Sequence, residues 1–118
     1  MFNLYWGDLH NHCSISYGHG TVEQALMRAR QQLDFCSVTG HAFWPDMPPD
    51  RSVYAEIIDY HNEGFATLAR NWDRLIELQR TGTSNGKFIA FPSYEWHSLK
   101  YGDHNVYTAT PDLPLRDA

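Results

Sequence analysis

The stretch Thr21-Val-Glu-Gln-Ala-Leu-Met-Arg-Ala-Arg-Gln-Gln-Leu-Asp-Phe-Cys-Ser-Val-Thr-Gly40 decides the fold class, because it joins a helix to a strand. Thr21 and Gln24 stand three positions apart, as in a capping box at a helix N-terminus. The apolar residues that follow recur at helical spacing, and they are Val22, Ala25, Leu26, Ala29 and Leu33. Residues 35 to 39 are rich in strand formers and stop at Gly40. The stretch therefore predicts a helix followed by a strand.

Residues 2 to 9 predict an earlier strand that is short and buried, since they contain aromatic and aliphatic side chains without a helical period. A strand, a helix and a second strand in this order are typical of a right-handed parallel crossover. We therefore predict an α/β fold with parallel strands.

The remaining sequence predicts a second helix and two more strands. An apolar stripe from Tyr54 to Ile76 predicts one long amphipathic helix, bent near Gly64. A turn is expected at 82–86, followed by strands at 88–94 and 105–108. The tail from residue 111 is expected to be irregular.

Composition narrows the class of protein. The 118 residues are 42% hydrophobic and 19% charged, as in a single globular domain. The nine Lys and Arg residues are scattered and the net charge is -5, which argues against nucleic acid as a bulk partner. Apolar runs are short, so we expect no membrane partner and a cytoplasmic location. Cys13 and Cys36 form no CxxC pair and are expected to be buried free thiols.

Imidazoles and one carboxylate follow the predicted strands. His10 and His12 project to the same side if the first strand persists, because strand side chains alternate with period two. His41 follows the second predicted strand, Glu95 the third, and His104 opens the fourth. The carboxyl ends of parallel strands meet at one rim. The pattern predicts that His10, His12, His41 and Glu95 meet there and bind divalent ions, with His104 as a further ligand.

Other polar residues admit plainer interpretations. A lone histidine is more often hydrogen-bonded in a core or at a surface than bound to a metal, so His61 is interpreted as structural. His97 stays open between ligand and surface residue. Asp8 is expected to support a ligand imidazole rather than to bind a metal ion directly. An aromatic set beside the ligands is either a substrate wall or plain packing, and it consists of Phe43, Trp44, Trp96 and Tyr101.

Four segments together resemble the opening motifs of the PHP superfamily, named for polymerase and histidinol phosphatase: Gly7-Asp-Leu-His-Asn-His12, Val38-Thr-Gly-His41, Tyr94-Glu-Trp96 and His104. They are most similar to a PHP-related branch with a domain of unknown function. The resemblance implies a distorted (β/α)7 TIM-like barrel, two or three zinc, manganese or iron ions, and hydrolysis of phosphoesters.

The sequence departs from the PHP pattern at several positions. Cys13 stands where Thr is usual, and Gly40 stands where the second motif usually has Asp. His19 is a candidate ligand in place of a nearby Asp that is missing. The family's later ligands have no counterpart after His104, and its barrel needs roughly two hundred residues or more. Residues 1–118 are therefore expected to form the N-terminal part of such a barrel, with open edges that favour self-association.

The sequence thus predicts a metal-dependent hydrolase acting on a small-molecule phosphoester, with water activated at a di- or trinuclear centre. One alternative is a metal-binding, non-catalytic fragment that needs more chain or a partner to complete its site. Another is a small α/β fold in which the histidines bind no metal.

Overall fold

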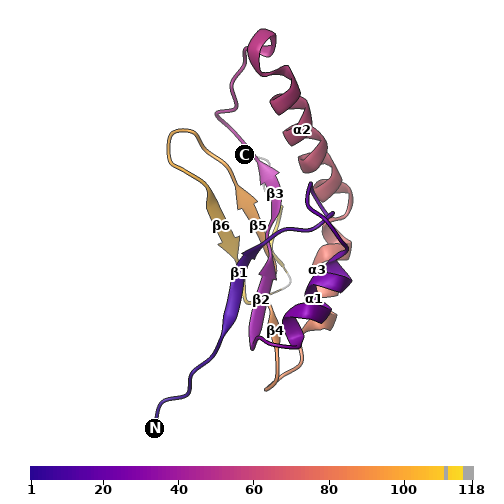
Figure 1. Ribbon diagram of the computed structural model, residues 1–118, viewed down its shortest axis with the longest axis vertical. Coiled ribbons are helices and arrows are strands. Elements are labelled where there is room, and N and C mark those ends of the chain that lie inside the picture. The colour runs from indigo at the N-terminus through magenta and orange to yellow at the C-terminus, as the bar shows by residue number, and fades with distance from the viewer. Residues whose placement is uncertain (111, 116–118) are drawn as a thin grey trace.

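The computed structural model describes residues 1–110 and 112–115. Its elements are, in chain order, β1 (Gly7–Asn11), α1 (Val22–Arg30), β2 (Phe35–Val38), β3 (Gly40–Phe43), α2 (Arg51–Arg70), α3 (Trp72–Gly82), β4 (Ile89–Ala90), β5 (Ser93–Trp96) and β6 (His104–Tyr107). The helices lie along one side of the strands, and the residues before β1 project away from the body (Figure 1). The fold is mixed α/β.

The strands form two small sheets that share two chain segments. The first sheet has the order β1-β2-β4 and all its strands are parallel. The second has the order β3-β5-β6, with β3 parallel to β5 and β5 antiparallel to β6. Only Thr39 separates β2 from β3, and residues 91–92 separate β4 from β5. Two nearly continuous extended segments therefore pass from one sheet into the other.

Buried hydroxyl groups satisfy the backbone where the chain passes between the sheets. The Ser37 hydroxyl donates to the Phe91 carbonyl at 2.8 Å, and the Ser93 hydroxyl donates to the Val38 carbonyl at 3.1 Å. The Thr39 N–H donates to the Asn11 carbonyl at 2.9 Å. An unpaired buried backbone group is costly, so these bonds allow both segments to change sheets inside the core.

Helix α1 confirms the capping-box prediction. The Thr21 hydroxyl accepts from the Gln24 N–H at 3.2 Å, and the Gln24 side chain accepts from the Thr21 N–H at 3.1 Å. The helix buries Val22 and Leu26 in a core that also contains Cys13, Cys36, Val38, Leu68, Leu75, Phe88 and Tyr94. Both cysteines are buried and free, as expected.

The single long helix predicted downstream is two helices, so that prediction is wrong. Helix α2 ends at Arg70 and α3 begins at Trp72, with Asn71 between them at φ -112° and ψ 11°. The Asn71 side chain donates to the Thr67 carbonyl at 2.8 Å. Such a bond from a side chain to the carbonyl four residues earlier competes with the backbone hydrogen bonds of the helix, and α2 ends here. Gly64, the expected bend, lies inside α2.

The predicted strands agree with the structure only in part. The first begins at Gly7 instead of Phe2 and is mostly exposed, so the prediction of a buried strand is wrong there. The predicted strand 88–94 is divided between β4 and β5. Strand β6 is antiparallel to β5, so the prediction of parallel strands fails there. Strand β3 was not predicted, because Gly40 suggested a stop. In the tail, residues 112–115 have no regular structure, and position 111 lies outside the described residues.

Within the described part of the chain, the two sheets close no barrel. The TIM-like barrel therefore stays a prediction. None of the described helices combines the length and apolar character needed to cross a bilayer.

Candidate metal centre

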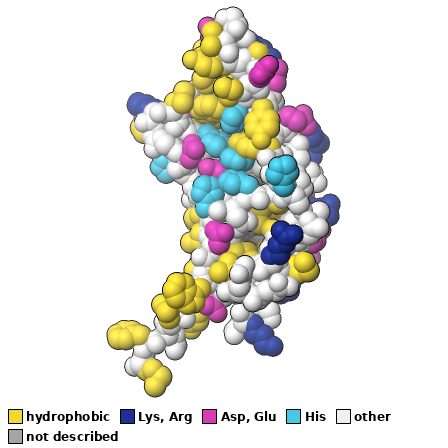
Figure 2. Space-filling model, in the orientation of Figure 1, with side chains coloured by type: hydrophobic (Ala, Val, Ile, Leu, Met, Phe, Trp, Pro, Cys, Tyr) yellow, Lys and Arg dark blue, Asp and Glu magenta, His cyan; other side chains and the backbone are white. Residues whose placement is uncertain are grey.

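Most of the predicted ligands come together from β1, β3 and β5, with His41 and Glu95 inside their strands rather than at the strand ends. His10 lies on β1 with His12 just beyond it, and His41 lies on β3 opposite Glu95 of β5 in the parallel register. His97 follows β5, and its N–H donates to the Phe43 carbonyl at 2.8 Å, so the extended pairing with β3 continues through it. Figure 2 shows histidine side chains gathered on one face with acidic groups beside them.

The first group of ligand atoms comprises His10, His12 and Glu95. Nε2 of His10 lies 3.3 Å from Oε2 of Glu95, Nε2 of His12 lies 3.2 Å from the same oxygen, and the two nitrogens are 3.0 Å apart. Ligand atoms on a tetrahedral zinc lie about 3.3 Å apart, because each bond is about 2.0–2.1 Å. The three separations therefore have the size of the edges of such a polyhedron.

A metal ion satisfies these three atoms better than protons do. All three atoms carry lone pairs and lie within 3.3 Å of one another, and a shared proton joins only two of them at a time. A cation accepts lone pairs from all three at once. The donor set of two imidazoles and one carboxylate suits zinc, manganese or iron. The residues present therefore fit a divalent ion.

The second group comprises His41, Glu95 and His97, whose ligand atoms lie within 4.8 Å of one another. Nδ1 of His41 is 3.3 Å from Oε2 of Glu95 and 2.5 Å from Nε2 of His97. Glu95 belongs to both groups and is only 3% exposed. Glu95 would therefore serve as a ligand common to both groups if ions were bound there.

Carboxylates outside the two groups orient their members. Nδ1 of His97 lies 3.1 Å from Oδ1 of Asp103, which favours the tautomer whose Nε2 lone pair faces the cluster. Asp103 was not predicted. Oδ1 of Asp8 accepts from the backbone N–H of His10 at 3.0 Å, so Asp8 holds the strand at His10 rather than an imidazole ring.

Burial keeps the imidazoles of His41 and His12 neutral. The pKa of His41 is lowered to about 2, first by burial and then by the neighbouring imidazoles of His12 and His97. Burial also lowers the pKa of His12, against the opposing attraction of Glu95. Neutral imidazoles offer free lone pairs, so metal binding at neutral pH competes with no proton at these two side chains.

Aromatic side chains form a wall beside the second group. The ring of Tyr17 stacks on that of His41, with centroids 3.8 Å apart, and burial raises the pKa of its phenol. Trp44 lies 5.9 Å from the ring of His97. By contrast, Trp96 packs near His104, and Tyr101 is exposed. Trp44 is therefore the member of the predicted aromatic set that lies close to the centre.

The structure places two predicted ligands outside both groups. His19 is exposed in the loop between β1 and α1. His104 is exposed on β6, and its Nδ1 donates to the Gly102 carbonyl at 2.9 Å. His61 donates from Nδ1 to the Ile57 carbonyl at 2.7 Å within α2, in keeping with a structural role.

His97 is the ligand that sequence reasoning left undecided, although a signal for it was present. Glu95 and His97 stand two positions apart on extended chain, as His10 and His12 do. The same period-two alternation therefore points both side chains to one face.

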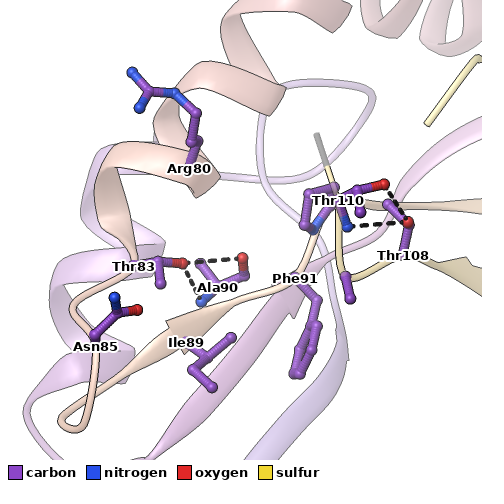
Figure 3. A pocket seen from close by; sticks show the side chains of 10 residues that line it. Arg80, Thr83, Asn85, Ile89, Ala90, Phe91, Thr108 and Thr110 are labelled. Carbon is purple, nitrogen blue, oxygen red and sulfur yellow. Dashed lines mark hydrogen bonds between the residues drawn. The ribbon is translucent and has the colours of Figure 1, made fainter. Parts of the chain in front are cut away.

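An apolar cavity of about 330 Å³ lies elsewhere, lined by β4, the end of α3 and residues 108–110. In Figure 3, the side chains of Ile89 and Phe91 lie between Arg80, Thr83 and Asn85 on one side and Thr108 and Thr110 on the other. None of the histidines or Glu95 lines it, so it is separate from the metal centre.

No protein-family model matches this chain, and no curated protein matches it either. Membership of the PHP superfamily therefore stays a prediction from the sequence motifs, whereas the candidate metal centre rests on the geometry of its own five side chains.

Proposed function

We propose that this chain is a metal-dependent hydrolase that cleaves small-molecule phosphoesters at a pair of divalent ions. The observation that carries the proposal is the single buried oxygen of Glu95, which lies 3.2–3.3 Å from nitrogens of three histidines in two groups. Two adjacent ions suit phosphoester cleavage, because they stabilise both the attacking and the leaving oxygen.

Each residue has a defined part in this proposal. His10 and His12 hold one position, His41 and His97 hold the other, and Glu95 joins them. When bound there, zinc, manganese or iron acidifies a coordinated water and polarises the phosphoryl oxygen. Three protein ligands at each position leave room for a water or substrate oxygen, as is usual at catalytic zinc sites. The half-exposed ring of His10 marks the side from which substrate enters.

The alternative is a metal-binding chain that needs a partner to become active. It is favoured by the open edges of the described sheets, where β1 and β4 each lack a neighbour on one side. Unpaired edges pair readily with another chain. A sizing column run across a range of concentrations tests this, since self-association would shift the protein to earlier elution as concentration rises.

The decisive experiment compares wild type with Glu95→Gln, which keeps the shape of the side chain and removes its charge. Metal content is measured by mass spectrometry, and hydrolysis of bis(p-nitrophenyl) phosphate and p-nitrophenyl phosphate is followed with added manganese or zinc. We expect about two ions in wild type, fewer in the variant, and turnover at least about 100-fold lower. Tyr54→Phe, on the exposed side of α2, is the control and should resemble wild type.

Metal in wild type without turnover of either ester would favour the partner-dependent alternative. A wild-type protein that binds no metal would refute both.

A further inference from the structure

Tyr17 contacts the metal centre directly, although no sequence motif singled it out. Its ring lies over His41 with an interplanar angle of 15°, and its hydroxyl is 3.3 Å from Nε2 of His97. That nitrogen is the atom His97 offers to the second ion position. The phenol hydroxyl therefore lies beside the position where a bound oxygen would complete the ligand set.

The ring of Tyr17 packs against α2 at Gly64, where only a residue without a side chain leaves room for it. Gly64 is buried within α2, and a Cβ added there would lie 2.0 Å from Cδ1 and 2.6 Å from Cε1 of Tyr17. Glycine inside a helix is less stable than alanine. The packing of Tyr17 against the bare backbone of α2 is the physical reason for a glycine at this position.

The backbone of Tyr17 is held as firmly as its ring. The Tyr60 hydroxyl, also on α2, donates to the Tyr17 carbonyl at 3.2 Å. The next residue, Gly18, donates its N–H to the Cys13 carbonyl at 2.9 Å. The hydroxyl of Tyr17 is thus positioned by a helix on one side and by His41 on the other.

Metal binding would leave the Tyr17 hydroxyl with a hydrogen to donate. Among the described residues, its hydrogen-bond contact is Nε2 of His97. Once that nitrogen gives its lone pair to an ion, it can no longer accept a hydrogen bond. A phosphoryl oxygen of a substrate held by the same residues would then be available to accept this hydrogen bond. A hydrogen bond to an anionic oxygen is among the stronger ones in proteins.

On the basis of the proposed function, we propose that the Tyr17 hydroxyl donates a hydrogen bond to a phosphoryl oxygen bound at the His41–Glu95–His97 position. Tyr17 is then a substrate-binding and catalytic residue, and Gly64 is the residue that positions it. Preorganised donors of this kind stabilise the charge that develops on oxygen during ester cleavage.

Inorganic phosphate is the probe for the test, and calorimetry measures its binding to the zinc-loaded full chain. Tyr17→Phe keeps the ring and its stacking on His41 but removes the donor. We expect unchanged zinc affinity and phosphate affinity weaker by about 10-fold or more, as for a lost hydrogen bond to a charged group. Gly64→Ala, which displaces the ring, should weaken phosphate binding in the same direction, and Tyr54→Phe should not.

The outcomes separate this inference from the proposed hydrolase. Equal phosphate affinity in wild type and Tyr17→Phe, including no measurable binding to either, overturns the role of Tyr17 and leaves the metal centre standing. Loss of zinc from Tyr17→Phe also overturns it, because the hydroxyl would then act as a ligand. A wild type without zinc refutes the proposed function itself.

Discussion

The two halves of the candidate centre share Glu95 but differ in their access to solvent. The side chains of His10 and His12 are 51% and 29% exposed, whereas those of His41 and His97 are 12% and 10% exposed. The inner pair also has support from Asp103 and Tyr17. If the proposed function is correct, this comparison predicts an open position that would exchange its ion readily and a closed position that would hold its ion more tightly.

The largest effect is expected from removing either pair of histidines. His10→Ala/His12→Ala should lose one of two ions and reduce turnover at least about 100-fold, beyond the 10–100-fold typical of losing an outer partner. Chelator-induced zinc release distinguishes the halves. His10→Ala/His12→Ala keeps only the ion at the closed position, whereas His41→Ala/His97→Ala keeps only the ion at the open position. We expect the first of these ions to be released more slowly than the second. Equal release rates would refute the difference between open and closed positions.

A smaller effect is expected at the outer carboxylate of the closed half. Asp103→Asn removes the charge that favours the productive tautomer of His97, so zinc affinity at that position should fall about 10–100-fold. Competition with a fluorescent chelator measures it. Asp8→Asn is the matched control, because the Asp8 carboxylate accepts a hydrogen bond from the backbone N–H of His10 and not from its imidazole ring. A similar loss in both variants would argue against the tautomer explanation.

Acidification should destabilise the metal-free protein through the closed half. The pKa of His41 is near its ordinary value of 6.5 when unfolded and about 2 when folded, so the unfolded state binds more protons between these values. The resulting stability is present above pH 6.5 and is lost as pH falls, by at most about 1.4 kcal/mol per pH unit. Urea unfolding from pH 7.5 to 5 measures the slope, and His41→Gln should flatten it. An unchanged slope would show that other groups cause it.

The smallest effect is expected at the two histidines outside both groups. His19→Ala and His104→Ala should leave metal content within about 10% of wild type, since neither ring lies with the other ligand atoms. Mass spectrometry of the purified variants decides this. Loss of an ion from either would restore that residue to the ligand set predicted from sequence.

Local rules made several features predictable. The capping box at Thr21 needs only residues three apart, and the common side of His10 and His12 needs only the alternation of a strand. The same alternation would have included His97. The structure also brings His41 and Glu95 together, but by pairing inside the parallel neighbours β3 and β5 rather than at the strand ends that the sequence predicted.

Features that depend on distant contacts were not predictable. The structure divides the second helical region at Asn71, whereas Gly64 lies inside α2 and packs against Tyr17 from the loop after β1. Asp103 reaches His97 only because β6 turns back antiparallel beside β5. That turn also places His104 at the exposed start of β6, outside both groups.

The sequence by itself determined the donor types, their pairing along extended strands and the helix that follows the first strand, since these depend on periodicity and short-range hydrogen bonds. Only the tertiary structure decided that Glu95 is shared by two groups, that one half is closed, and that Tyr17 lies over His41. Those properties arise from burial and from contacts between segments far apart in the chain, which no local pattern encodes.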